Sequence, residues 1–141
     1  MKRNYPLLIF ILACISILSG NLTKGVSLAG RLGINLFYQE YKFFKVWWQA
    51  ALVSFALMIM VTVLLYFVDK SLNGVFRKII LLIFFFAFLA GLYFTFSNFR
   101  NDLSHRLLGE RFHLGIYLYW IGFCIISLFY ALTSKKQPVR Y

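Results

Sequence analysis

Two long apolar segments on either side of one charged turn constrain this chain more than any other feature. The segments 46–68 and 79–99 each run for more than 20 positions without an Asp, Glu, Lys, Arg or His. A helix needs about 20 predominantly apolar residues to cross the hydrocarbon core of a bilayer. The intervening turn, 69–78, holds one acidic and three basic side chains and a glycine, which predicts an aqueous position at the lipid headgroups. The pattern therefore predicts a helical membrane hairpin.

Composition extends this prediction to the whole chain. Of its 141 residues, 62% are hydrophobic and only 13% are charged, whereas about 25% of the residues in a soluble domain are charged. We therefore expect an all-α integral membrane protein, a four-transmembrane-helix bundle that forms one domain over 1–141. The expected spans lie near 5–22, 47–68, 78–98 and 113–134.

The first expected span allows two interpretations. Lys2 and Arg3 precede an apolar run, which is also the pattern of a cleaved secretory signal. The uncharged stretch continues from residue 4 to residue 23, which is long enough for a slightly short span. We expect a retained helix, with cleavage as the alternative.

The segment before the second span predicts an amphipathic helix at the membrane surface. Within the loop 23–46, Ile34, Phe37 and Tyr41 recur at helical spacing. The segment leads into Trp47 and Trp48, which are typical of an aromatic belt at the headgroups. The helix is either a structured start to the second span or a surface that lies on lipid or binds a partner.

The polar loop 99–112 and its flanks carry the remaining candidate residues. We expect contacts with lipid headgroups or with a partner from the following side chains: His105, Arg106, Arg111, His113, Trp47 and Trp48. A metal site needs three or four converging ligands, and two histidines eight positions apart do not supply them. We therefore predict no catalytic residue, no metal and no cofactor.

The net charge of +11 indicates a membrane rather than nucleic acid as the partner. The 15 basic residues are spread over every segment between the spans, and anionic headgroups attract each of them by about 1 kcal/mol. Eight of these residues flank the two ends and the central turn, and seven lie in the other two loops. Because positive residues favour the cytoplasmic side, we expect a bacterial inner-membrane protein with both termini in the cytoplasm. Insertion in both orientations is the alternative.

The expected function follows from the uncharged spans. Ionisable residues inside a membrane mark ion pathways and proton relays. In the four expected spans no Asp, Glu, Lys, Arg or His lies beyond the first position, where Lys78 and His113 begin the third and fourth spans. Ala50 with Ser54, and Ala87 with Gly91, have the small-residue spacing of helix contacts. We therefore expect a non-catalytic accessory or scaffold subunit, bound to other membrane subunits or to a second copy.

Two alternatives remain open at this point. The first is an oligomeric pore or exporter with an uncharged polar lining, which Ser54, Thr62, Thr95 and Ser127 would supply. The second is an interfacial protein or enzyme that binds a lipid or a quinone through the polar residues His105, Arg106, Arg111 and His113.

Overall fold

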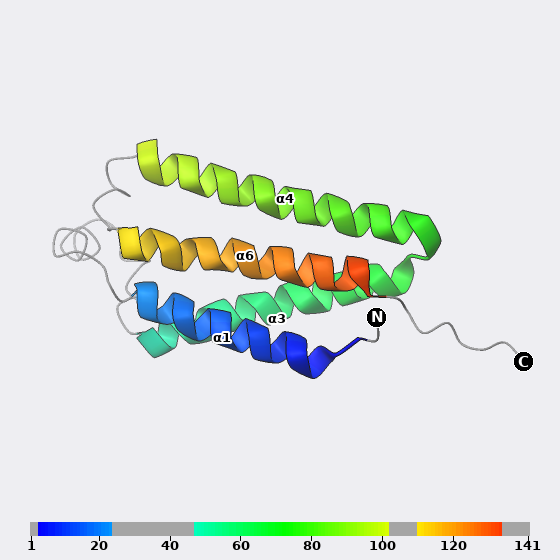
Figure 1. The fold of residues 1–141 in the computed structure, drawn as a ribbon, viewed down its shortest axis with the longest axis horizontal. Coiled ribbons are helices and arrows are strands. Elements are labelled where there is room, and N and C mark those ends of the chain that lie inside the picture. The colour runs from blue at the N-terminus through cyan, green and yellow to red at the C-terminus, as the bar shows by residue number, and fades with distance from the viewer. Residues whose placement is uncertain (1–2, 24–46, 102–109, 134–141) are drawn as a thin grey trace, which may run out of the picture.

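The computed structural model describes residues 3–23, 47–101 and 110–133. Over these ranges the chain forms four helices that run side by side (Figure 1), namely α1 (Tyr5–Thr23), α3 (Trp47–Ser71), α4 (Gly74–Asn101) and α6 (Glu110–Leu132). Each helix contains a segment long and apolar enough to cross a membrane. The prediction of an all-helical fold with four such helices is confirmed. The amphipathic helix expected before the second span lies outside the described residues.

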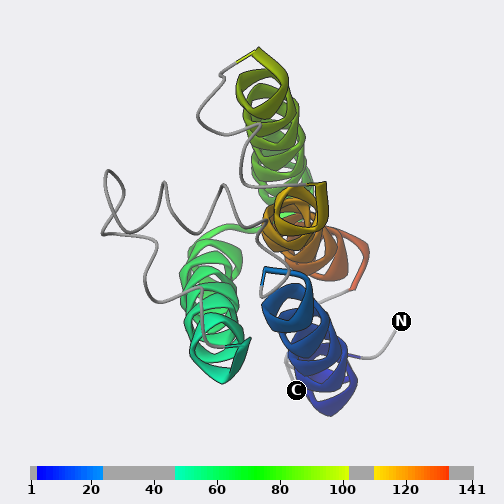
Figure 2. The same ribbon diagram turned by 90° about the vertical axis from the view of Figure 1, so that its left-hand side faces the viewer.

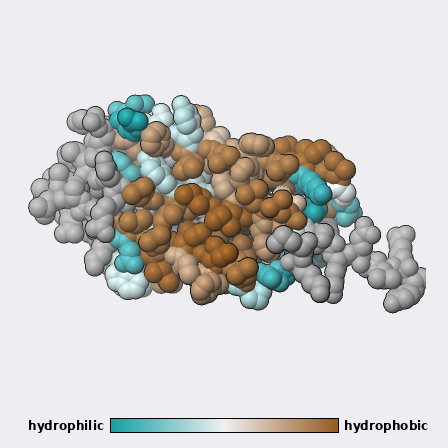
Figure 3. Space-filling model, viewed as in Figure 1, coloured by the Kyte–Doolittle hydropathy of each residue, from teal (hydrophilic) through white to brown (hydrophobic). Residues whose placement is uncertain are grey.

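The outer surface of the described helices is strongly apolar. Large hydrophobic side chains such as Phe10 and Phe86 are 66% and 64% exposed. Brown, hydrophobic surface fills the middle of the face in Figure 3, and teal, hydrophilic patches lie toward the two ends. Soluble monomers rarely expose apolar patches of this extent. The surface is consistent with an integral membrane protein.

Helix α6 occupies the centre of the bundle. It packs against α1, α3 and α4, and α1 also packs along α3. Figure 2 shows α4 on the opposite side of α6 from α1 and α3. The shared core includes Leu12 of α1, Met58 of α3, Leu81 of α4 and Ile126 of α6. Most of the circumference of α4 therefore has no helix against it among the described residues.

The central turn differs from the solvated loop expected for residues 69–78. Helix α3 continues to Ser71 and α4 begins at Gly74, whose φ of +63° suits a glycine. Asp69 and Arg77 therefore lie within helices, where they are only 1% and 6% exposed. The aqueous exposure expected for these two charges is wrong, because helix extension turns both side chains into the bundle. The position of the turn at the lipid headgroups stays a prediction.

Small residues allow the helices to approach closely. A methyl group added at Gly20 would lie 2.5 Å from the backbone oxygen of Trp47 and 2.9 Å from the Cβ atom of Ala51. Ala50 and Ser54, the pair expected to form a helix contact, are both buried. In the second expected pair, Gly91 lies against the ring of Trp120. Close backbone approach of this kind stabilises helix pairs in membranes.

Replacing Gly20 by Ala should destabilise the bundle by about 1–3 kcal/mol, because the added methyl group overpacks the contact between α1 and α3. Thermal unfolding in mild detergent, followed by helical circular dichroism, measures the loss. Asn21→Ala changes the next, exposed position and should unfold close to the wild-type temperature. Equal unfolding temperatures for the two variants would contradict the close approach at Gly20.

Candidate functional site

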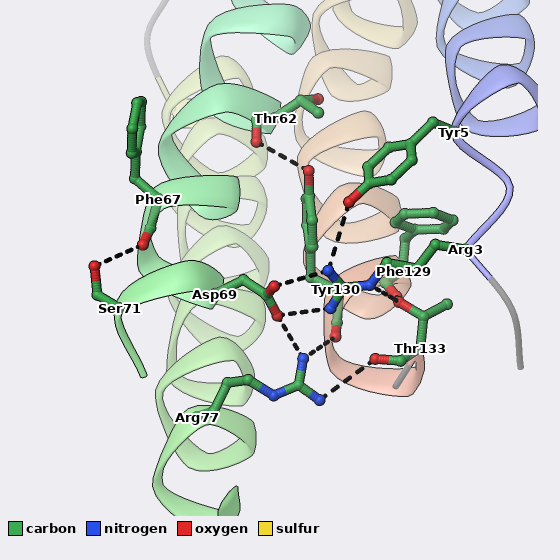
Figure 4. A network of polar contacts seen from close by, with 10 residues as sticks. All are labelled: Arg3, Tyr5, Thr62, Phe67, Asp69, Ser71, Arg77, Phe129, Tyr130 and Thr133. Atoms are coloured by element: carbon green, nitrogen blue, oxygen red, sulfur yellow. Dashed lines mark hydrogen bonds and ion pairs between the residues drawn. The ribbon is translucent and has the colours of Figure 1, made fainter. Parts of the chain in front are cut away.

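A buried carboxylate lies between two arginines at one end of the bundle (Figure 4). The Asp69 oxygens Oδ2 and Oδ1 accept hydrogen bonds from Nη1 and Nη2 of Arg3, each at 2.8 Å. Arg77 Nη1 also donates to Asp69 Oδ1. A bidentate arginine–carboxylate pair is among the strongest polar contacts in proteins. Asp69 therefore joins the segment before α1 to both α3 and α4.

The same two arginines also bind the end of α6. Arg77 donates from Nη1 to the Tyr130 carbonyl and from Nη2 to the Thr133 carbonyl, both at 3.3 Å. Arg3 Nε donates to Thr133 Oγ1 at 3.2 Å. The last carbonyls of a helix lack helical partners and carry partial negative charge. Arg77 thus supplies both hydrogen bonds and positive charge at the C-terminal end of α6.

The aromatic ring of Tyr130 completes this arrangement. The Arg3 guanidinium lies 5.5 Å from the ring centroid, a distance at which a cation and an aromatic face attract each other. The Tyr130 hydroxyl donates to the Thr62 carbonyl of α3 at 3.3 Å. We name Arg3, Asp69, Arg77, Tyr130 and Thr133 the Asp69 clamp, because together they connect all four helices.

The chemistry of the clamp favours holding helices together over proton transfer. Burial lowers the pKa of Arg3, but its hydrogen bonds to Asp69 and Tyr5 and the negative charge of Asp69 outweigh burial and raise the pKa above its ordinary value. Arg3 therefore stays charged. An ionised carboxylate has about four acceptor positions, and the two guanidiniums already donate three hydrogen bonds to Asp69.

The opposite end of the bundle carries the residues predicted from the sequence. Trp47 and Trp48 begin α3 and are 43% and 50% exposed. The His113 ring stacks on Phe99 with centroids 4.4 Å apart, and the Arg100 guanidinium lies 5.5 Å from the Phe96 ring centroid. Arg100 and His113 line one polar pocket of about 370 Å³, and neither tryptophan contributes to its lining.

The other predicted contact residues are not placed by the structure. His105 and Arg106 lie outside the described residues, and Arg111 belongs to the first turn of α6, where the structure describes the backbone alone. Their contacts with headgroups or with a partner stay predictions. Arg100, which the sequence analysis did not single out, is the arginine that the structure places beside the pocket at this end of the bundle.

The four hydroxyls considered for a pore lining bind backbone carbonyls. Thr62 donates to Met58 at 2.8 Å and Thr95 donates to Gly91 at 2.9 Å, each within its own helix. Ser54 donates to Ala51 at 3.2 Å, and Ser127 reaches across to Leu81 at 2.7 Å. All four hydroxyls therefore have a backbone acceptor, and the hydroxyl of Ser127 also joins α6 to α4.

The clamp was not predicted from the sequence, although one signal pointed to it. Asp69 directly follows an apolar run in a chain with 15 basic and only four acidic residues. An acidic side chain in that position lies close to the hydrocarbon and needs a cation. Arg77 lies only eight positions away, but the bidentate partner Arg3 was not evident, because it lies 66 positions away in the chain.

Comparison of the chain with protein-family models, with curated proteins and with solved structures finds no match. Function is therefore inferred from the packing of the four helices and from the two ends of the bundle. One end is closed by the Asp69 clamp, and the other presents Arg100 and His113 around a pocket.

Replacing Asp69 by Ala should destabilise the bundle by about 3–5 kcal/mol, because it leaves buried guanidinium charge without its carboxylate. Thermal unfolding in detergent measures the effect. Lys78→Ala removes a charge at an exposed position of α4 and should change stability little. Replacing Arg3, Asp69 and Arg77 together by Met, Leu and Met should recover part of the loss, because no unpaired charge remains. A wild-type unfolding temperature for Asp69→Ala would contradict the clamp.

Proposed function

We propose that this protein is a non-catalytic accessory or scaffold subunit of a larger membrane complex. The observation that carries the proposal is the position of α4, a helix of 28 residues in which Arg77, Leu81 and Phe99 are the buried side chains. It lies against α6 alone along most of its length. Helices in a membrane gain stability from close packing, and the other described helices leave most of the surface of α4 uncovered.

The state of the polar groups supports a structural role. The Asp69 carboxylate is bound by two arginines, and the hydroxyls of Ser54, Thr62, Thr95 and Ser127 bind backbone carbonyls. The ion pairs of Asp69 and the hydrogen bond of Ser127 connect different helices, and the other three hydroxyls bind carbonyls of their own helix. They favour a subunit that supplies a rigid transmembrane surface over a pore with a hydroxyl lining.

The outer face of α4 is the surface proposed to bind the partner. Ile83 and Phe86 are 59% and 64% exposed, and the small residues Ala87 and Ala90 beside them are also exposed. Large side chains next to small ones form the ridges and notches that transmembrane helices use to pack. The proposed occupant is an apolar transmembrane helix of another subunit.

We further propose a bacterial inner-membrane location with both termini in the cytoplasm. The clamp brings together Arg3, the turn between α3 and α4, and the end of α6. These segments therefore lie at the same end of the bundle. The two ends and the turn hold eight of the chain's 15 basic residues, and positive residues favour the cytoplasmic side.

Photo-crosslinking in the native membrane tests the partner surface. A benzophenone amino acid at Phe86 of α4 should crosslink to a different membrane protein, and the crosslinked partner should co-purify with the wild-type chain in mild detergent. Phe10 of α1 is similarly exposed and is the matched control position, expected to give little crosslinking. A free monomer with no α4 crosslink would overturn the proposal, and crosslinks only to a second copy would replace it with a homo-oligomer.

A further inference from the structure

An apolar groove runs along α6 between α1 and α4. Its volume is about 610 Å³, within the range of about 300–1,000 Å³ that is typical of small-molecule sites. Leu18 and Leu22 of α1 form one wall and Leu92 and Phe96 of α4 form the other, with Leu118 and Ile121 of α6 between them. Figure 2 shows α1 and α4 on opposite sides of α6, which is why the two walls stand apart. The groove suits a hydrocarbon chain.

One end of this groove is polar. The pocket that contains Arg100 and His113 shares three lining residues with the groove: Phe96, Leu114 and Tyr117. The two spaces are therefore adjoining parts of one amphipathic site. A ligand that fills both parts needs an apolar tail and a polar head.

The position of Arg100 along α4 indicates the depth of this polar end. Arg77 and Arg100 lie 23 positions apart on one helix, which is about 35 Å at a rise of about 1.5 Å per residue. The hydrocarbon core is about 30 Å thick. With Arg77 at one surface, Arg100 lies at the headgroup layer of the other, at the same end of the bundle as Trp47 and Trp48. The apolar groove then extends from that layer into the hydrocarbon.

We propose that this site binds one anionic phospholipid, with an acyl chain in the groove and the phosphate bound by Arg100. A guanidinium presents several N–H donors that match phosphate oxygens, and the chain's net charge of +11 favours an anionic head. A neutral amphiphile such as a quinone would supply no anion to Arg100, which forms no ion pair with the side chains that the structure describes. The site lies beside α6, and it does not require the proposed partner on the outer face of α4.

Lipid retention by the isolated protein tests the head of the site. Protein purified in mild detergent and incubated with equal amounts of phosphatidylglycerol and phosphatidylcholine should retain phosphatidylglycerol preferentially in native mass spectrometry. Arg100→Gln should reduce that preference about fivefold, the effect of roughly 1 kcal/mol. Lys78→Gln makes the same charge change on an exposed position at the other end of α4 and should keep the preference. Equal retention of the two lipids by the wild type would overturn the proposal.

A second pair of variants tests the tail of the site. Leu92→Trp places a larger ring in the groove and should reduce retention of phosphatidylglycerol severalfold. Leu82 lies on the same helix outside the groove and is 41% exposed, so Leu82→Trp should retain the lipid as the wild type does. Equal loss in both variants, or no loss in either, would contradict an acyl chain in the groove.

A lipid-crosslinking measurement on the wild-type protein tests the site without depending on the folding of a variant. Phosphatidylglycerol with a diazirine on its acyl chain should label peptides that contain 89–96 and 114–121, in preference to peptides of α3. Uniform labelling of all four helices would indicate bulk lipid and overturn the proposal. This measurement uses the isolated protein, whereas the accessory-subunit proposal is tested by crosslinking to partners in the native membrane. Failure of one proposal can therefore be distinguished from failure of the other.

Discussion

The arrangement of the bundle depends on one buried carboxylate held by two guanidiniums. Asp69 binds Arg3 and Arg77, and both arginines also bind the end of α6. Placing such charges inside a protein is expensive, and the cost is offset only where geometry and hydrogen bonding are nearly complete. Here the bidentate contact and the buried carbonyls of Tyr130 and Thr133 at the end of α6 provide those hydrogen bonds. Among the described helices α4 packs mainly on α6. The clamp also connects α4 to α3 and to the segment before α1.

The different packing of the described helices at the two ends of the bundle accounts for the remaining features. Near the clamp, α3 and α4 are joined by two residues, Leu72 and Asn73, which keeps their adjoining ends close. Away from it, α4 stands across α6 from α1 (Figure 2), and the groove of about 610 Å³ lies between those helices. The proposed partner surface and the proposed lipid site both follow from this position of α4. They use different sides of the helix, so a lipid in the groove leaves the outer face available.

Sequence reasoning found what depends on local pattern and missed what depends on distant contacts. The four apolar helices and the buried pair of Ala50 and Ser54 follow from composition and spacing, which report on a helix directly. The burial of Asp69 does not, because a few residues of helix extension change a solvated turn into an internal contact, and Arg3 lies far away in the chain. His113 was recognised from its position at the start of a span, whereas its stacking on Phe99 and the role of Arg100 needed the packing of α4 against α6.

The outer face of α4 is expected to lie in hydrocarbon between two polar ends. Spin labels at Val75, Phe86 and Asn98, all exposed positions of α4, measure this in liposomes after replacement of the free Cys14 and Cys124. Collision rates with oxygen, which concentrates in hydrocarbon, are compared with those of a water-soluble nickel chelate. We expect high oxygen and low nickel accessibility at Phe86, with nickel accessibility rising at Val75 and Asn98. Nickel access at Phe86 equal to that at Val75 would contradict this expectation.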